Sequence, residues 1–534
     1  MARILVVEPV AQPGLDALTA AHESDVCLGL SRPELLDLLR DTTGWDALIV
    51  RSQTRVDAEL LAAAAPRLSV VGVASVGIDR IDVEAATRAG VMIVNAPTGN
   101  TIAAAEHTMA LMLALLRRVP EANDSVRAGE WERSRYTGRE LRGKTLGVIG
   151  LGKIGRAVAR RATGFEMRVL ASDPYLTEEQ AAEAGARLVG MAELLHRSDV
   201  LTVHTPLTAQ TRHLLGRAQL EATKPGAFVL NVARGGIVDE SALADALASG
   251  HLAGAAVDVF STEPMPHDNP LRAAPNVVLT PHLGASTAEA QDRVGLEMAE
   301  QVLMALGGVT PPYAVNAPSV APETQPRLRP YVELGRRLAS LARQLAPGAF
   351  DSVSLTYAGE IAAGECAPIR TAAIAGILEA VTDQRVNAVN ADVVAHERGL
   401  TVRETRTASS EPWASLVELS IGPADGEPAL SLAGSTAHGR PHLAGLDGFA
   451  IDAELAGIML VTRHQDRPGI VGRVGTILAD AGINISSLEL SRLSEHGEAM
   501  MFVAVDDPLD ATSLERIRAA DGIVEASVVE LPSL

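Results

Sequence analysis

Three polar side chains that follow apolar, strand-like runs have the residue types needed to oxidise a hydroxy acid. Arg234 follows "AFVLNVA", Glu263 follows "AAVDVFST" and His282 follows "NVVLTP". A neutral imidazole can accept a hydroxyl proton near pH 7, and a carboxylate can fix its tautomer. A planar guanidinium can hold a substrate carboxylate through two hydrogen bonds. The set therefore predicts general-base catalysis on an alcohol that also carries an anionic group.

Each of these residues alone also has a purely structural explanation. Arg234 and Glu263 could form surface ion pairs, and His282 is one of 13 histidines, most of which do no chemistry in a typical chain. The carboxyl ends of parallel strands lie at one edge of a sheet, so we expect the three side chains to meet there. We interpret His282 as the base, Glu263 as its partner and Arg234 as the substrate clamp.

A glycine-rich turn is predicted at the same edge. The run "TLGVIG" leads into Gly150, Gly152 and Gly155, and a helix-forming segment follows. This spacing lets the backbone approach a pyrophosphate, which the helix N-terminus then binds. Asp173 ends the next strand, roughly 20 residues later, where a carboxylate binds ribose hydroxyls and disfavours a 2′-phosphate. The pattern predicts NAD, although Asp173 could instead be a turn acid before Pro174.

Other residues at this edge are expected to complete the cofactor site. For His204 the sequence leaves two possibilities open, packing or a place beside the nicotinamide. The remaining predicted cofactor contacts are Lys153, Ile154, His204, Thr205, Pro206, Thr211, Val232, Ala233, Asp258 and Gly284.

The elements that position these residues alternate between strands and helices. Two successive series of this kind occur, which predicts an α/β fold of doubly wound parallel sheets. A long helical run starts at Asn100 and is expected to end near Pro120, and residues 288–306 are expected to pack back on the first unit as a helix. A later helix is expected over residues 367–381, between a strand and two β-type runs.

The predicted organisation has a discontinuous first domain and a regulatory half. The last segment has the strand and helix order of a ferredoxin-like βαββαβ domain. The predicted boundaries are residues 1–98 with 286–306 for substrate binding, 99–285 for NAD binding, 307–330 for a Pro-rich linker, 331–452 for an intervening α/β domain, and 455–534 for the ferredoxin-like domain.

Composition excludes several classes of partner. The chain has 46 basic and 66 acidic residues and a net charge of −20, which argues against nucleic acid or an anionic membrane surface. Cys27 and Cys366 lack metal or redox spacing, so we predict reduced, buried thiols and no metal site. No signal-peptide layout and no run of about 18 apolar residues occurs, so a cytoplasmic protein is expected.

Several segments are similar to the D-isomer-specific 2-hydroxyacid dehydrogenases. They include "NAPTGNTIAAAEHT", "GKTLGVIGLGKIGR", "HTPLTAQTRHLLG", "NVARGGIVDE", "AAVDVFSTEP" and "LTPHLGASTAEAQDR". The resemblance covers residues 1–306. It implies two Rossmann-like domains with catalysis in the cleft between them, and it assigns the family's catalytic residues to Arg234, Glu263 and His282.

The segment "VTRHQDRPGIVGRVGTILADAGINISSLELSR" resembles an ACT domain, a small module that senses amino acids. A Pro-Gly pair that opens a helix leaves N–H groups for a carboxylate, Asp466 could bind an ammonium, and Asn484 can both donate and accept. The resemblance implies L-serine as effector, bound between the ACT domains of two subunits near His464, Asp466 and Asn484. Alternatively, the domain serves only assembly.

The order of dehydrogenase, intervening domain and ACT domain resembles the long-form members of the family that oxidise 3-phospho-D-glycerate. It implies at least a homodimer, or a homotetramer, in which Arg133 reaches across a subunit interface. Relatives commonly read "RAGVGLD" where this chain reads "VASVGID", so Val73 stands at the expected phosphate-binding arginine. The implied substrate-binding residues are Arg51, Ser75, Val76, Gly77, Asn100 and Arg133.

Two other functions remain as alternatives. Val73 would allow an unphosphorylated substrate such as glycerate, glyoxylate or hydroxypyruvate, because a lost charge-assisted hydrogen bond costs roughly ten- to a hundredfold in affinity. A corepressor-type protein that only senses NAD is the second alternative, and the intact catalytic set and acidic composition count against it. The segment "HGRPHLAGLDGFAIDAEL" is poor in basic residues, so we expect no anion-binding regulatory role for the intervening domain.

Overall fold

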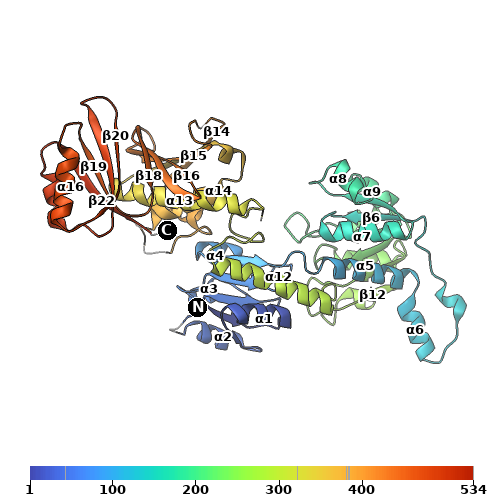
Figure 1. The fold of residues 1–534 in the computed structure, drawn as a ribbon. Helices are drawn as coiled ribbons and strands as arrows, with labels where there is room; N and C mark the ends of the chain where they lie inside the picture. The colour runs from blue at the N-terminus through green and yellow to red at the C-terminus, as the bar shows by residue number, and fades with distance from the viewer. Residues whose placement is uncertain (42–43, 322, 380–381, 383–384, 410, 533–534) are drawn as a thin grey trace.

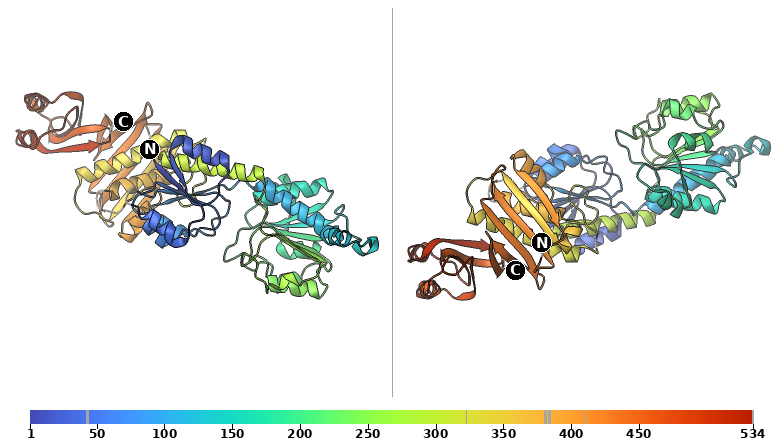
Figure 2. Two further views of the ribbon diagram at one scale, coloured as in Figure 1. Left: turned by 90° about the horizontal axis from the view of Figure 1, so that it is seen from below. Right: turned by 90° about the horizontal axis from the view of Figure 1, so that it is seen from above.

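The described part of the chain forms four sheets, each in a separate unit. The computed structural model describes residues 1–41, 44–321, 323–379, 382, 385–409 and 411–532. The units lie in a row, with the second unit at one end and the fourth at the other, and the first and third between them (Figures 1 and 2). The C-terminal sheet therefore lies far from the unit that carries the glycine-rich turn.

The first sheet is parallel, with strand order β2-β1-β3-β4-β5. Of its three inner strands, β3 and β4 are buried at every residue, as expected for a parallel sheet covered on both faces. The strands are β1 Arg3–Val6, β2 Glu23–Val26, β3 Ala47–Val50, β4 Val70–Val73 and β5 Met92–Asn95, and the helices are α1 Gln12–Ala21, α2 Arg32–Leu39, α3 Ala58–Ala63 and α4 Val83–Arg88.

Helix α12, Ala288–Leu306, returns from the second unit and packs on the first, as expected. Its residues Val294, Met298 and Val302 join the core formed by Ile4 and Val6. Figure 1 shows this helix along the first sheet, with one end directed toward the second unit.

The second sheet is also parallel, with order β12-β11-β10-β9-β6-β7-β8. The order reverses between β6 and β9, which is where ligands bind in open α/β sheets. Its strands are β6 Thr145–Ile149, β7 Arg168–Ser172, β8 Arg187–Leu188, β9 Val200–Val203, β10 Phe228–Asn231, β11 Gly254–Val257 and β12 Val277–Leu279. Its helices are α5 Thr101–Leu116, α6 Val119–Arg127, η1 Arg133–Tyr136, α7 Lys153–Gly164, α8 Glu178–Glu183, α9 Met191–Arg197, α10 Arg217–Glu221, α11 Glu240–Ala248 and η2 Pro270–Arg272.

The predicted long helix from Asn100 is two helices in the structure. Helix α5 ends at Leu116, and Arg118 adopts a left-handed conformation with φ of 55° before α6 begins. Pro120 lies in the first turn of α6. Backbone N–H groups in the first turn of a helix make no intrahelical hydrogen bond, so a proline is tolerated there. The first helix thus ends close to Pro120, as expected, but the proline opens a second helix that was not predicted.

The segment predicted as a linker is held against the first sheet. Ala314 forms an isolated bridge with Val94, and the Val315 amide donates to the Ile93 carbonyl at 2.8 Å. The side chain of Asn316 accepts from the Ile93 amide at 2.8 Å. Helix α13, Gln325–Leu345, begins inside the range predicted as linker.

The third sheet is mixed, with order β14-β13-β15-β16-β17-β18. Its elements are β13 Ser352–Gly359, η3 Glu360–Ala363, α14 Ala367–Leu378, α15 Ala391–Glu397, β14 Thr401–Thr407, β15 Ser415–Gly422, β16 Leu430–Ala437, β17 Arg440–Leu446 and β18 Phe449–Glu454. Strands β14, β17 and β18 were not predicted. Residues 380–381 of the expected helix 367–381 lie outside the described part of the chain.

The fourth sheet has order β20-β21-β19-β22 and the predicted βαββαβ sequence of elements. These are β19 Gly457–Gln465, α16 Ile470–Asp480, β20 Ile485–Arg492, β21 Glu498–Val505, α17 Ala511–Arg518 and β22 Ile523–Leu531. One face packs on the third unit, because Met459 and Phe502 share a core with Leu334 of α13. The buried Arg337 of α13 also donates to the Pro532 carbonyl at 2.8 Å.

Both cysteines are free thiols. Cys366 is buried as predicted, whereas Cys27 is only partly buried, so the prediction was wrong for that residue. Within the described residues, every helix is too short or too polar to cross a bilayer.

Candidate active site

A cleft of about 920 Å³ lies between the first and second units. Residues of both units line it, so the two parallel sheets present their ligand edges to the same space. Of the residues predicted from the sequence, the cleft brings together Arg51, Ser75, Val76, Gly77, Asn100, Arg234, Glu263 and His282.

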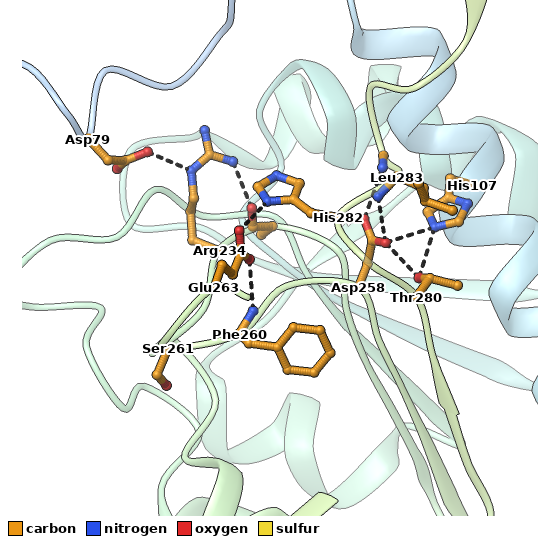
Figure 3. A network of polar contacts seen from close by, with 12 residues as sticks. Asp79, His107, Arg234, Asp258, Phe260, Ser261, Glu263, Thr280, His282 and Leu283 are labelled. Carbon is orange, nitrogen blue, oxygen red and sulfur yellow. Dashed lines mark hydrogen bonds and ion pairs between the residues drawn. The ribbon is translucent and has the colours of Figure 1, made fainter. Parts of the chain in front are cut away.

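His282 and Glu263 form a hydrogen-bonded pair at the wall of the cleft (Figure 3). The His282 Nδ1 lies 2.8 Å from Glu263 Oε2, and Glu263 Oε1 accepts from the Phe260 amide at 3.0 Å. The hydrogen bond to Glu263 raises the pKa of His282 above its ordinary value, although burial opposes this. Burial works to raise the pKa of Glu263, but the hydrogen bonds from His282 and Phe260 outweigh it and hold that pKa low. The ring therefore has its Nε2 free to exchange a proton while Nδ1 is fixed.

The backbone at His282 has an uncommon conformation for a non-glycine residue, with φ of 57°. The buried carboxylate of Asp258 holds this turn, accepting from the Leu283 amide at 2.8 Å and from Thr280 Oγ1 at 2.6 Å. His107 of α5 reaches the same carboxylate at 3.2 Å (Figure 3). Asp258 thus positions His282 through the backbone, and its predicted contact with the cofactor remains a prediction.

Arg234 contacts the first unit across the cleft. Its Nε donates to Asp79 Oδ2 at 3.1 Å, and its Nη1 donates to the Ala233 carbonyl at 2.7 Å (Figure 3). The guanidinium lies directly over the turn at Gly77, where an added Cβ would come within 2.3 Å of Arg234 Nη2. Asp79 was not predicted from the sequence, because no local pattern links it to a residue 155 positions away.

The turn opposite Arg234 is suited to an anion. Ser75 Oγ donates to the Gly77 carbonyl at 2.6 Å, and Asn95 Nδ2 donates to the Val76 carbonyl at 2.7 Å. Among the described residues, the amides of Val76 and Gly77 have no hydrogen-bond acceptor. Free amide donors beside a guanidinium form an anion-binding concavity, so a substrate carboxylate fits here.

The glycine-rich turn has the conformation that its sequence predicts. Gly150 has φ of 87°, and an added Cβ there would come within 2.7 Å of Thr205 Cγ2. An added Cβ at Gly155 would lie 2.2 Å from the Gly150 carbonyl oxygen, whereas the side of Gly152 is open, next to the start of α7. The Asp173 carboxylate accepts from the Leu151 amide at 2.9 Å, so it lies at the turn as the prediction requires.

The surroundings of this turn fit a nicotinamide dinucleotide. His204 Nδ1 and Thr205 Oγ1 are buried without a hydrogen-bond partner in the described residues, and such groups are costly unless a ligand satisfies them. Burial lowers the pKa of His204 to about 4, so its ring is neutral, and Thr202 Oγ1 lies 3.0 Å from Nε2. Packing and a place beside the nicotinamide are therefore both compatible with the structure.

The other predicted cofactor residues have varied surroundings. Lys153 lies over the Tyr313 ring at 5.3 Å, and Thr211 Oγ1 donates to the Pro206 carbonyl at 2.6 Å. Ile154 is partly buried against the second core. The buried predicted residues are Val232, Ala233 and Gly284.

Arg133 is not part of the cleft in its own chain. It lies exposed in η1, which follows α6 in the chain, and Figure 1 shows α6 at the side of the second unit away from the first. Its predicted contact with substrate therefore requires a second subunit.

The predicted effector residues do not meet within one chain. Asp466, after β19, accepts from Arg492 at 2.8 Å, whereas Asn484, before β20, donates to Asp506 at 2.6 Å. The register of β19 and β21 pairs His464 with Ala499 and Ile458 with Val505, so Asp466 and Asn484 lie at opposite ends of the sheet. His464 is buried, and burial lowers its pKa. A site that contains all three residues would need two copies of the domain.

Three family models match consecutive parts of the chain. Residues 109–284 match the NAD-binding domain of D-isomer specific 2-hydroxyacid dehydrogenases. Residues 327–444 match the D-3-phosphoglycerate dehydrogenase intervening domain, and residues 458–522 match the ACT domain.

Named relatives and solved structures agree with these matches. A D-3-phosphoglycerate dehydrogenase of Archaeoglobus fulgidus is 41% identical over 99% of this chain and 100% of its own length. The TT0316 protein of Thermus thermophilus is 39% identical, with a TM-score of 0.54 over 59% of this chain and 99% of its own. An NAD-dependent formate dehydrogenase of Staphylococcus aureus, solved with NAD, is 29% identical, with a TM-score of 0.52 over 58% of this chain and 96% of its own.

The fold and the cleft thus define an NAD-dependent dehydrogenase of the D-isomer-specific 2-hydroxyacid class. Within that class, the chain belongs to the D-3-phosphoglycerate dehydrogenase family, whose catalytic, intervening and ACT units it contains in order.

Proposed function

We propose that this dehydrogenase oxidises 3-phospho-D-glycerate to 3-phosphooxypyruvate, the first step of L-serine biosynthesis, with feedback inhibition by L-serine. The observation that carries the proposal is the cleft itself, in which the His282–Glu263 pair faces a guanidinium and a turn with free amides. The imidazole can accept a proton from a substrate hydroxyl, and the guanidinium and amides can bind a carboxylate next to that hydroxyl. The name of the full-length relative supports phosphoglycerate as the particular substrate.

Each side chain has a defined part in the reaction. Arg234 Nη2 and the amides of Val76 and Gly77 bind the substrate carboxylate and so orient the neighbouring carbinol carbon. His282 Nε2 accepts the hydroxyl proton, and the Glu263 carboxylate stabilises the imidazolium that forms. Bound NAD supplies the acceptor for the hydride that leaves the same carbon.

The residues proposed to hold NAD are those at the glycine-rich turn and the neighbouring strand ends. The helix N-terminus after Gly152 favours the pyrophosphate, and Asp173 favours ribose hydroxyls over a 2′-phosphate. Thr205 Oγ1 and His204 Nδ1 have no hydrogen-bond partner among the described residues, so both atoms are available to bound NAD. This arrangement supports NAD rather than NADP.

Two features support regulation by an amino acid in an oligomer. The ACT domain is a ligand-binding module, and its predicted effector residues lie at opposite ends of one sheet, so a shared site between two copies would unite them. Arg133, exposed and absent from the residues that line the cleft of its own chain, would likewise need a partner subunit to reach a substrate. We therefore propose at least a homodimer.

The proposal is tested by initial rates of NADH formation with 3-phospho-D-glycerate and with D-glycerate at equal concentrations. We expect the phosphorylated substrate to have a kcat/KM at least roughly tenfold higher, because a phosphate adds charge-assisted hydrogen bonds. Equal or faster oxidation of D-glycerate would contradict the substrate assignment. Adding L-serine to the same assay should lower the rate, and a flat response would remove the feedback proposal.

A further inference from the structure

Basic side chains in the cleft are few, and their surroundings differ. Among the described residues, the arginines that line it are Arg51, Arg80 and Arg234. Arg234 forms an ion pair with Asp79. The guanidinium groups of Arg51 and Arg80 have no ion pair, hydrogen bond or ring contact in the described part of the chain. Two uncompensated cations therefore remain in the cleft of a protein with net charge −20.

Strand β4 contributes no charge to this cleft. Its last residue, Val73, is 1% exposed and belongs to the apolar core of the first unit with Leu48 and Val50. A phosphate in the cleft therefore needs other cations, because a buried anion without a partner is costly, and within one chain these are the arginines on the loops that follow the strands.

The backbone of Arg80 is fixed at the end of the substrate-binding turn. Its carbonyl accepts from the Val56 amide at 3.0 Å, and the neighbouring Ile81 forms a bridge with Val56. The preceding residue, Asp79, holds Arg234. Arg80 thus lies immediately beyond the residue that orients the carboxylate clamp, with its side chain exposed and its backbone hydrogen-bonded to Val56.

Arg51 is fixed in a similar way on the neighbouring loop. The buried Glu8 carboxylate accepts from the amides of Ser52, Gln53 and Thr54, at 2.9, 3.0 and 2.8 Å. These three hydrogen bonds hold the loop that follows Arg51 in its conformation. Arg51 and Arg80 thus lie on two hydrogen-bonded loops that line the same cleft, and guanidinium groups are well suited to bind phosphate.

We propose that Arg80 is a specificity-determining residue that binds the substrate phosphate together with Arg51, and so supplies the charge that Val73 does not. This inference rests on the proposed function, because the phosphate belongs to the proposed substrate. Asp79 and Arg80 then serve the two ends of one molecule: Asp79 positions the carboxylate clamp, and Arg80 binds the phosphate.

The test compares Arg80→Met, Arg80→Lys and the control Arg55→Met, each assayed with 3-phospho-D-glycerate and with D-glycerate. Arg55 is a fair control because it carries the same charge nearby, is 75% exposed, and pairs with Asp57 outside the cleft. We expect Arg80→Met to lower kcat/KM for the phosphorylated substrate by roughly 10- to 100-fold and to leave D-glycerate oxidation within about twofold. Arg80→Lys should retain part of the preference, and Arg55→Met should keep the wild-type ratio.

The outcomes separate this inference from the proposed function. A wild-type protein that prefers D-glycerate would contradict the proposed function itself. If the wild type prefers 3-phospho-D-glycerate and Arg80→Met keeps that preference, the substrate stands and the assignment of Arg80 is wrong. An equal loss on both substrates would also overturn the assignment, because the residue would then not act on the phosphate. Since Arg80 is exposed, the variant is expected to fold, and its thermal unfolding midpoint checks this.

Discussion

Replacing His282 with alanine should lower kcat for hydroxy-acid oxidation by roughly 100- to 10,000-fold, the range for loss of a general base. The hydroxyl proton then has no acceptor at the cleft wall, since Glu263 would lose the ring that connects it to the substrate. NADH binding should stay close to wild type, because the glycine-rich turn lies on other strands. Stopped-flow turnover and NADH fluorescence titration of the same preparation measure the two effects.

A matched control separates chemistry from backbone strain. His282 and His438 both have positive φ, 57° and 52°, but His438 lies in an exposed turn between β16 and β17 of the third unit. His438→Ala introduces the same backbone strain without touching the cleft, so its turnover should match that of the wild type. A His282→Ala protein that retains most of its turnover would remove His282 as the base.

Replacing Glu263 with glutamine should lower kcat on the order of 100-fold and move the pH profile. The glutamine carbonyl can still accept from the Phe260 amide, so the loop is kept while the charge is lost. Glu263 raises the pKa of His282, hence its removal lowers that pKa. Oxidation requires the neutral imidazole of His282, so the acid limb of kcat/KM for oxidation should shift to lower pH. The reverse reaction requires the protonated imidazole, so its rate should begin to fall at a lower pH than in the wild type.

The neighbouring carboxylate Glu240 provides the control for this shift. It accepts from the Ser261 amide at 2.6 Å and from Asn269, in the same loop region, without contacting His282. Glu240→Gln should leave the position of the acid limb unchanged. An acid limb that stays in place in Glu263→Gln, or moves to higher pH, would contradict the role given to Glu263.

The positions of the catalytic set could be predicted from the ends of the strand-like runs. Arg234, Glu263 and His282 each follow such a run, and parallel strands bring these positions to one edge. The same reasoning could not find Asp79 or His107, because their contacts join segments that are distant in sequence. The left-handed backbone at His282 is equally invisible in the residue pattern, since tertiary contacts with Asp258 impose it.

The place of a residue in an antiparallel sheet cannot be predicted from its distance along the sequence. Helix α16 and the register of β19 with β21 separate Asp466 and Asn484 by the length of a strand within one domain, so the effector site implied between two ACT domains stays a prediction. The Pro-rich segment after α12 has the composition of a free linker, but Ala314 and Val315 pair with the edge of the first sheet. Composition cannot distinguish the two cases, because edge pairing uses backbone groups alone.

Strands β17 and β18 of the intervening unit could not be predicted from the residue pattern. The segment that forms β17 and β18 contains two glycines, Gly445 and Gly448, and its alternation is interrupted where the pairing register shifts between Leu443 and Gly445. A bulge of this kind breaks the two-residue period on which strand prediction depends. Val73 replaces an arginine that the resemblance predicts, and its burial in the core shows that this strand supplies no charge to the cleft.

The central claim is that this cleft removes a hydride from the carbinol carbon of 3-phospho-D-glycerate. The most direct test is a single turnover of the wild-type protein with NAD and substrate deuterated at that carbon, followed by mass spectrometry of the nicotinamide product. We expect NADH that carries the deuterium, formed more slowly than from unlabelled substrate. NADH without the label, or no NADH from this substrate, would contradict it.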